Sequence, residues 1–493
     1  MGRRATVFVF GALIVFGAGL RFWKLSGVGL WYDELWFVVG ASDISFSEMY
    51  REWLLGDPHP PGFLIANFLW FKLVPNDELW SRLPSALAGL ATLLFLLFGT
   101  KKTLSLDERL TSAAFVSLSY AAIYYALTVK QYAGMMLFAT VATVAYLEVV
   151  QTRRFDWRVA LRFGGSFVAL AWLNYFATLY VALLGALLFL ALRREPAELR
   201  RALKAAAVVV VLCLPLVPFQ YIALQETPGD WQHDSFAALV SDSLPFLFFR
   251  HPRVGFMVAA LLGAALVSLA LRKDARVALR TERNLHLLLV AGLGLALFLS
   301  LGLFKPTWFI RYFLILFPVA LLGLGVVVAA AFPLRSLAFA LVPLAFFSEA
   351  AVVEYREFDG FMRQHWDKSV DLVLANAKSS DLVVVLGWPQ DKTALEYLRE
   401  KNENGVYYVH NLSFYRYYFR RRGADEVAAK LEVVMPSLSS TTAFIERARG
   451  RTVWVLGGHH IKFDDDALEA LKQQAKDYEF TQLFSTRVYR ATF

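Results

Sequence analysis

The feature that most limits the fold of this chain is a series of apolar runs long enough to cross a membrane. A helix that spans the hydrocarbon core needs about 20 predominantly apolar residues. The run near residues 159–192 is too long for one span, and Asn174-Tyr175 near its middle predicts a hairpin of two helices. With this pair we expect a polytopic α-helical membrane protein with about eleven transmembrane helices. The other runs lie near residues 6–22, 82–100, 110–128, 133–150, 204–221, 254–271, 285–303, 311–330 and 334–350.

The composition agrees with this class. Hydrophobic residues make up 57% and charged residues 18% of the 493 residues, whereas soluble domains carry about 25% charged residues. The formal net charge of +9 comes from short Lys and Arg patches between the apolar runs. Such a distribution is typical of membrane orientation signals and argues against a nucleic-acid partner. The single Cys213 excludes an internal disulfide.

The basic patches also predict the topology. Gly62–Val74 is apolar but too short for a span, so we interpret it as an interfacial or re-entrant helix. The patches then share one side of the membrane, which the positive-inside rule makes cytoplasmic. The amino terminus is cytoplasmic in this scheme, and the first loop, 23–81, is external. The patches are Arg3-Arg4, Lys101-Lys102, Arg153-Arg154, Arg193-Arg194 with Arg200-Arg201, Arg272-Lys273 with Arg276 and Arg280, and Arg335.

The long apolar runs end near residue 352. We therefore predict a transmembrane domain, 1–351, and an external domain, 352–493. In the second part, β-rich runs alternate with helical patterns such as Asp464–Ala475. That alternation predicts a small soluble α/β domain, periplasmic or extracellular. The predicted strands lie in Asp381–Trp388, Gly405–His410, Arg451–Gly457 and Phe484–Phe493.

The first external loop holds the polar residues that most need an explanation. Asp33 and Glu34 follow the first span, and Asp57 and His59 precede the next apolar run. Ionisable groups this close to hydrocarbon are costly, so they indicate a functional site. A structural alternative is that the acidic pair caps an interfacial helix and that Pro60-Pro61 begins the following one.

Cations gather on the same external face. Each has an alternative role as an anchor at the headgroup level. Arg311 and Lys130 fit that role less well, because they interrupt or begin spans on the side that the positive-inside rule disfavours. Cations beside carboxylates suggest an anionic headgroup held near a base, and a lipid-linked phosphate fits this description. The cations are Arg82, Lys130, Arg250, Arg253, Lys305 and Arg311.

In residues 1–330 the order of these motifs resembles the GT-C superfamily of membrane glycosyltransferases, related to bacterial protein O-mannosyltransferases and lipid A aminoarabinose transferases. The first-loop acidic pair, the His59-Pro60-Pro61 run and the segment from Arg82 to Gly89 match the superfamily in order and spacing. Lys130-Gln131-Tyr132 takes the place of a polar-basic-tyrosine element, and Arg311-Tyr312 through Pro318 matches a late-helix pattern.

The resemblance implies a multi-pass enzyme of the bacterial inner membrane. Such an enzyme moves a sugar from a polyprenyl-phosphate donor to a hydroxyl acceptor on the external face, with inversion. We expect Asp33 to be the base that takes the acceptor proton. Glu34 is expected to orient loop residues or the acceptor, and Asp57 and His59 to hold the acceptor.

Fixed positive charge is needed where the departing phosphate gathers negative charge. Arg311 is the first candidate, because its planar fork binds phosphate oxygens in pairs. Lys130 supports it, Arg250, Arg253 and Lys305 are further candidates, and Arg82, Tyr132 and Tyr312 complete the expected substrate site.

Three alternatives remain beside this interpretation. No cofactor is needed for a monophosphate leaving group, but Asp33, Asp57 and His59 offer enough ligands for a divalent cation. A transporter or flippase of an anionic polyprenyl-linked lipid would explain the external cations, although transporters place their charges near the bilayer midplane. A scaffolding protein would leave the acid and cation array unused.

Overall fold

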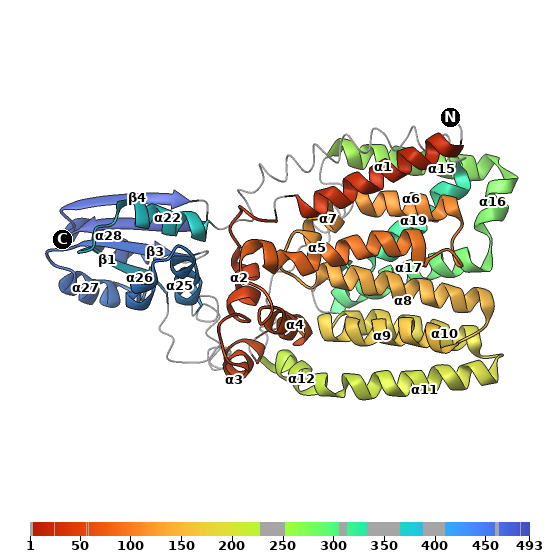
Figure 1. Ribbon diagram of the computed structural model, residues 1–493, viewed down its shortest axis with the longest axis horizontal. Helices are drawn as coiled ribbons and strands as arrows, with labels where there is room; N and C mark the ends of the chain where they lie inside the picture. Colours follow the sequence, from red (N-terminus) through yellow and green to blue (C-terminus); the bar gives the residue numbers. More distant parts are fainter. Residues whose placement is uncertain are drawn as a thin grey trace.

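The computed structural model describes residues 3–23, 25–55, 57, 59–226, 252–304, 313–332, 365–387, 410–458, 463–483 and 485–493. At residue 3 and within 224–226, 252–259 and 301–304 the backbone alone is described. The chain forms an elongated helical bundle with a smaller α/β domain at one end (Figure 1). The predicted boundary between residues 351 and 352 lies outside the described residues, so it stays a prediction.

The bundle consists of long, apolar helices that run roughly side by side (Figure 1). Among the described residues, five helices are long and apolar enough to cross a membrane, and three shorter helices are also apolar. The predicted class of helical membrane protein is confirmed, while the count of about eleven spans stays a prediction. The elements are α1 (Arg3–Phe22), α5 (Glu78–Leu94), η2 (Phe95–Gly99), α6 (Leu106–Leu118), α7 (Tyr120–Ala126), α8 (Tyr132–Thr152), α9 (Trp157–Leu173), α10 (Ala177–Leu192), α11 (Pro196–Cys213), η3 (Leu214–Leu216), α12 (Val217–Glu226), α15 (Pro252–Leu271), α16 (Lys273–Leu279), α17 (Glu282–Phe304) and α19 (Phe317–Ala331).

The predicted hairpin at Asn174 is present, because α9 ends at Leu173 and α10 begins at Ala177. The Asn174 side-chain oxygen accepts from the Phe176 N–H at 2.8 Å and fixes the turn. The run near residues 110–128 differs from the prediction of one continuous span. It breaks at Ser119, whose extended backbone separates α6 from α7 and whose hydroxyl accepts from the Ala122 N–H.

Short helices cap the end of the bundle that faces the α/β domain: α2 (Tyr32–Val39), α3 (Phe46–Glu48), η1 (Met49–Leu54) and α4 (Gly62–Trp70) (Figure 1). Helix α4 has nine residues, which at 1.5 Å per residue give about 14 Å, less than half the hydrocarbon thickness. The prediction that Gly62–Val74 does not span is therefore confirmed.

The α/β domain contains a five-stranded sheet in the order β2-β1-β3-β5-β4. Strands β2, β1 and β3 are parallel, and β5 and β4 extend the sheet in antiparallel fashion. Three predicted strands and the helix near Asp464–Ala475 are confirmed; β2 and β4 were not predicted, and residues 405–409 lie outside the described part. The elements are α22 (Trp366–Asn376), β1 (Leu382–Leu386), α25 (Asn411–Arg421), α26 (Asp425–Lys430), β2 (Glu432–Val434), α27 (Leu438–Arg447), β3 (Thr452–Gly457), α28 (Asp465–Gln474), β4 (Asp477–Leu483) and β5 (Thr486–Thr492).

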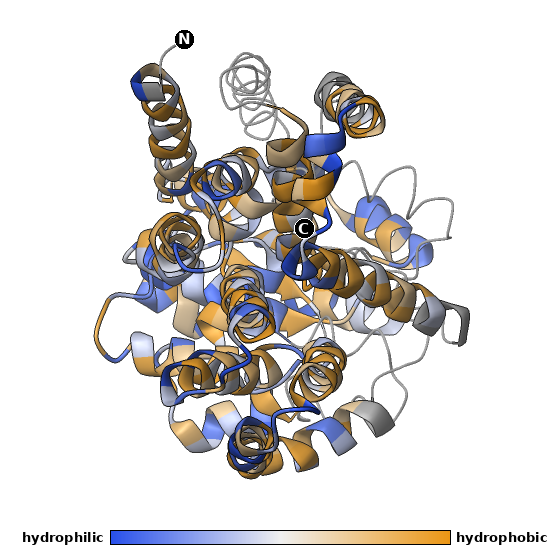
Figure 2. Cartoon of the chain, turned by 90° about the vertical axis from the view of Figure 1, so that its right-hand side faces the viewer, coloured by the Kyte–Doolittle hydropathy of each residue, from blue (hydrophilic) through white to orange (hydrophobic). Residues whose placement is uncertain are grey.

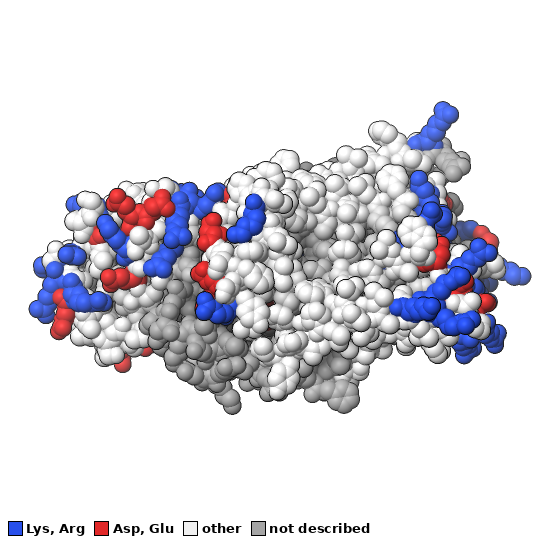
Figure 3. Space-filling model, turned by 60° about the horizontal axis from the view of Figure 1, so that its bottom comes forward, with Lys and Arg blue, Asp and Glu red and all other residues white. Residues whose placement is uncertain are grey.

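The distribution of polarity matches a membrane setting. Seen end-on, hydrophobic residues cover most of the bundle helices (Figure 2), and Val208, Val210 and Val211 of α11 are 59–62% exposed. Helices that are apolar on their outer faces suit a lipid environment. On the face that Figure 3 shows, charged side chains gather at both ends of the molecule and are almost absent between them.

Candidate active site

Helix α2 carries the acidic pair to the junction between the bundle and the α/β domain. Asp33 lies in its first turn, and its Oδ2 is 3.1 Å from the Nζ of Lys130, which comes from the turn between α7 and α8. The Asp33 side chain is 22% exposed and that of Lys130 only 5%. The Lys130 ammonium also lies 4.8 Å from the centre of the Phe37 ring, a favourable cation–π distance. The Asp33 carboxylate is therefore partly accessible to a ligand, while the Lys130 ammonium is enclosed and packs against the Phe37 ring.

Glu34 has different surroundings, although it is the next residue. Its carboxylate forms a buried two-pronged pair with Arg82 of α5, at 2.9 Å from Nε and 2.7 Å from Nη2. It also accepts from the Val129 N–H at 3.0 Å. Arg82 further donates to the carbonyls of Leu25, Val28 and Gly29.

These contacts bear on the predicted roles of the pair. The five hydrogen bonds of Arg82 equal the number of N–H groups that a guanidinium has. Glu34 is 1% and Arg82 is 2% exposed. The geometry therefore favours a structural role, in which the pair fixes α2 and the preceding loop to α5. The predicted catalytic role of Glu34 and the substrate-binding role of Arg82 stay predictions.

Asp57 and His59 form a second polar pair. The Asp57 Oδ1 lies 2.7 Å from the His59 Nδ1 and accepts from the His59 N–H at 2.8 Å. Its other oxygen accepts from the Trp36 indole N–H at 3.0 Å. Asp57 thus fixes the imidazole and leaves Nε2 as the nitrogen for a ligand. The His59 side chain is 24% exposed, which suits the predicted contact with an acceptor.

Phe37 joins the two polar pairs. Its ring contacts the Lys130 ammonium and lies 6.3 Å from the His59 ring. Asp33, Trp36 and Phe37 stand at i, i+3 and i+4 and so share one face of α2. The sequence analysis did not name the two aromatic residues, although this spacing was a signal that could have found them.

Tyr175, at the hairpin between α9 and α10, lies near the second pair. Burial, and next the Asp57 carboxylate, raise the pKa of the Tyr175 hydroxyl. Its oxygen is buried and has no hydrogen-bond partner among the described residues. An unpaired buried hydroxyl is uncommon, so Tyr175 joins the candidate acceptor-binding residues.

The remaining predicted residues fall into two groups. Tyr132 is buried in the bundle, with its ring 4.7 Å from that of Tyr125, and its predicted contact with substrate stays a prediction. The described part of the chain contains no group of three or more His, Cys, Asp or Glu side chains arranged for a metal. Arg250, Lys305, Arg311 and Tyr312 lie outside the described residues, as does the side chain of Arg253.

The α/β domain reaches the site through His410, which precedes α25. Its ring lies 4.0 Å from that of Trp53 and 4.8 Å from that of Trp36. His410 is 3% exposed, and burial lowers its pKa to about 3, so the ring is neutral. The domain therefore packs directly against the residue that holds Asp57.

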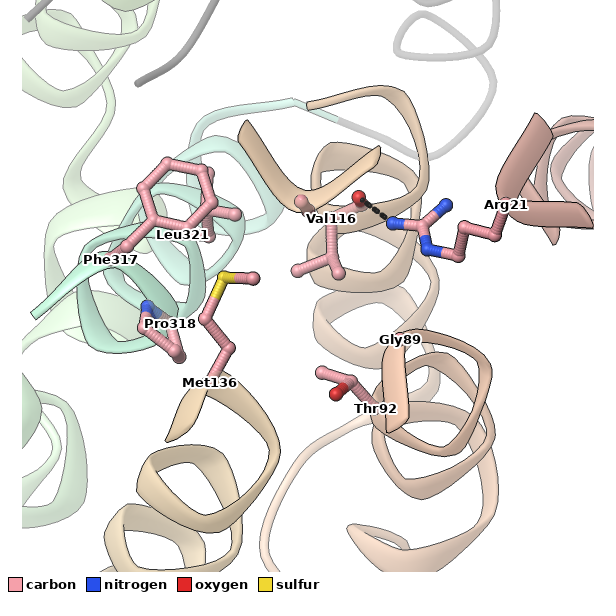
Figure 4. Close-up of a pocket in the computed structure, with 9 residues that line it drawn as sticks. Arg21, Gly89, Thr92, Val116, Met136, Phe317, Pro318 and Leu321 are labelled. Carbon is pink, nitrogen blue, oxygen red and sulfur yellow. Dashed lines mark hydrogen bonds between the residues drawn. The ribbon is translucent and has the colours of Figure 1, made fainter. Parts of the chain in front are cut away.

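Arg21 at the end of α1 is a fully buried cation whose role was not predicted (Figure 4). It donates to the carbonyls of Gly17, Val116 and Ser117 at 2.5, 2.7 and 3.2 Å. The last two carbonyls lie where α6 breaks, and inside a membrane freed backbone groups need partners. A Cβ on Gly89 would lie 3.2 Å from the Arg21 side chain. Arg21 thus caps a broken helix within the bundle.

Comparisons with known proteins agree with this architecture. The family model described as dolichyl-phosphate-mannose-protein mannosyltransferase matches residues 58–220. None of the curated proteins matches the chain by sequence.

The fold is similar to two crystal structures of ArnT from Cupriavidus metallidurans. The structure bound to undecaprenyl phosphate superposes with a TM-score of 0.60 at 10% identity, covering 99% of this chain and 98% of that one. The apo structure gives a TM-score of 0.55 at 12% identity, with 98% and 97% covered. The family match and the shared fold confirm the resemblance of this chain to the GT-C superfamily of membrane glycosyltransferases.

Proposed function

We propose that the protein transfers a sugar from a polyprenyl-phosphate donor to a hydroxyl acceptor at the external face of the bacterial inner membrane. The observation that carries the proposal is the accessible Asp33 carboxylate, held 3.1 Å from the enclosed Lys130 ammonium. The neighbour ArnT binds undecaprenyl phosphate, and the matching family is named for a dolichyl-phosphate-mannose donor. Both names support a lipid-phosphate donor for this chain.

The chemistry needs a base and a fixed positive charge. The acceptor oxygen attacks the anomeric carbon while Asp33 takes the acceptor proton. The bond between that carbon and the phosphate oxygen breaks from the opposite side, so the configuration inverts. The departing lipid phosphate gains one negative charge, and we assign the stabilisation of this charge to the Lys130 ammonium. Arg311 stays the first candidate for binding the phosphate in a two-pronged way, with Arg250, Arg253 and Lys305 as further candidates.

We assign binding of the hydroxyl acceptor to the second polar pair, Asp57 and His59. With Nδ1–H donated to Asp57, the His59 Nε2 can accept a hydrogen bond from an acceptor hydroxyl. Phe37, whose ring lies 6.3 Å from that of His59, and Trp36, whose indole N–H donates to Asp57, connect this pair to α2 and so to Asp33.

Transfer can be tested with purified protein in nanodiscs that contain radiolabelled polyprenyl-phosphate sugars. The proposal predicts release of polyprenyl phosphate together with a glycosylated or hydrolysed product. The competing flippase function predicts movement of intact donor across a proteoliposome membrane without product. Donor that crosses the membrane unchanged, with no released phosphate, would overturn the enzyme assignment.

The orientation needs a separate test. In a Cys213→Ala background, Ala443→Cys in the α/β domain should react with an impermeant thiol reagent added outside intact cells. Lys101→Cys, at the opposite end of the bundle, should react only after the membrane is opened. External labelling of Lys101→Cys would reverse the proposed topology.

A further inference from the structure

The external domain and the first loop share one hydrophobic core. Leu30, Leu35 and Phe37 of the loop belong to the same buried cluster as Phe414 and Tyr418 of α25. The ring of Tyr32, beside Asp33, lies edge-on to Phe414 at 5.2 Å. The two parts therefore pack as one body at this junction.

The first turn of α2 is held from two opposite sides. From the bundle, Glu34 is fixed by Arg82 and its Oε2 accepts from the Trp31 N–H at 3.3 Å. From the external domain, the Tyr418 hydroxyl accepts from the Leu30 N–H at 2.6 Å and lies 3.4 Å from the Leu30 carbonyl. Among the described residues, the Leu30 N–H donates to the Tyr418 hydroxyl.

Such support matters because α2 is short. Eight residues are fewer than the roughly 12 that an isolated helix needs to be even marginally stable in water. The position of Asp33 therefore depends on the groups that hold its first turn. Leu30 is fully buried, so its N–H has no route to water if the Tyr418 oxygen is removed.

We propose that Tyr418 is a positioning residue for the transfer reaction: α25 of the external domain fixes the start of α2 and thereby places Asp33. The inference rests on the proposed function of Asp33 as the base. It assigns the external domain a role in transfer, because α25 contacts the backbone of the first loop at Leu30.

Helix α25 provides its own controls. Tyr415 and Tyr417 are buried like Tyr418, and each hydroxyl donates to one carbonyl. Tyr415 bonds to Gly457 inside its own domain at 3.0 Å, and Tyr417 bonds to Asn76 in the loop before α5 at 2.7 Å. The three Tyr→Phe variants each remove one buried hydroxyl, but only that of Tyr418 contacts the start of α2.

The test compares kcat, donor KM and amide exchange in the three variants. We expect Tyr418→Phe to lower kcat by roughly 10-fold to 10²-fold, since small displacements of catalytic groups have effects of that size. Donor KM should stay near the wild-type value. Amide exchange of the peptide that covers α2 should rise in Tyr418→Phe and not in Tyr415→Phe or Tyr417→Phe. Equal kcat and equal exchange in all three variants would overturn the inference.

A second pair of variants gives a rescue test. A Cβ added to Gly29 would lie 2.7 Å from the Cγ of Asp367 in α22, so Gly29→Ala forces the Asp367 carboxyl or the loop that holds Gly29 to move. We expect Gly29→Ala to lower kcat and Asp367→Ala to restore it in the double variant. Failure of the rescue would contradict positioning by domain contact.

The exchange measurement does not depend on catalysis. If wild-type protein shows no transfer, the proposed function fails, while a selective change at α2 would still report the contact. If wild-type protein is active, Asp33→Asn is inactive and Tyr418→Phe behaves as wild type, the function stands and this inference fails.

Discussion

The acidic pair offers the sharpest test of the site, because the two neighbours should respond to mutation in opposite ways. Glu34→Gln removes the charge that neutralises Arg82 and turns an amide N–H₂ toward its N–H groups. Both side chains are at least 98% buried. Breaking such a pair costs about 3–5 kcal/mol of unfolding free energy. Asp33→Asn should cost about 1 kcal/mol, because Asp33 is partly exposed, but should lower turnover by roughly 10² or more.

Both quantities can be measured on the same preparations. Unfolding free energy comes from denaturant titration in detergent, followed by tryptophan fluorescence, and turnover from released polyprenyl phosphate. A Glu34→Gln protein as stable as the wild type but inactive would make Glu34 a participant in the chemistry. Near-normal turnover in Asp33→Asn would remove Asp33 from the role of base.

Three further predictions concern the buried cations and the neutral histidine. Arg21→Met should lower the unfolding free energy by about 2 kcal/mol, roughly one for each of the Val116 and Ser117 carbonyls left unpaired, whereas the exposed Arg158→Met should have little effect in the same titration. Lys130→Met should lower turnover by roughly 10²-fold and raise donor KM; unchanged kinetics would exclude Lys130 from the donor site. His410 has a pKa of about 3 in the fold and an ordinary value of 6.5, so between these pH values the unfolded chain binds a proton that the folded chain does not. Stability should therefore fall as pH falls below 6.5, by about 2 kcal/mol at pH 5, and titrations of His410→Phe at pH 7 and 5 should show a smaller loss.

The helical class was predictable because it depends on the solvent. Runs such as 133–150 need no knowledge of neighbours, since a lipid-facing or bundle-facing helix is apolar in either case. The break at Ser119 was not predictable in this way. It requires Arg21, 96 residues from Ser117 in sequence, to satisfy the carbonyls that the break frees. An apolar pattern contains no information about such a partner.

The structure brings two of the predicted site residues together, while their roles stay predictions. Asp33 and Lys130 were both assigned to the site, and the structure brings them into contact. The different environments of Asp33 and Glu34 depend on the register of α2 and on the location of Arg82, which is 48 residues from Glu34 along the chain. Neither can be read from the local sequence. Likewise, Tyr418 is 388 residues from Leu30, and no local pattern connects them.

The register of α2 accounts for the different environments of two adjacent carboxylates. Successive residues on a helix point about 100° apart, because one turn holds 3.6 residues. Asp33 therefore shares a face with Phe37 and meets Lys130, while Glu34 turns toward Arg82 in the bundle. In the proposed function Asp33 is the base and must stay accessible, whereas the buried Glu34 needs the paired Arg82. Adjacent positions, about 100° apart on one turn, are enough to place the two carboxylates in these different environments, which gives a physical reason for an Asp33-Glu34 pair at this point of the loop.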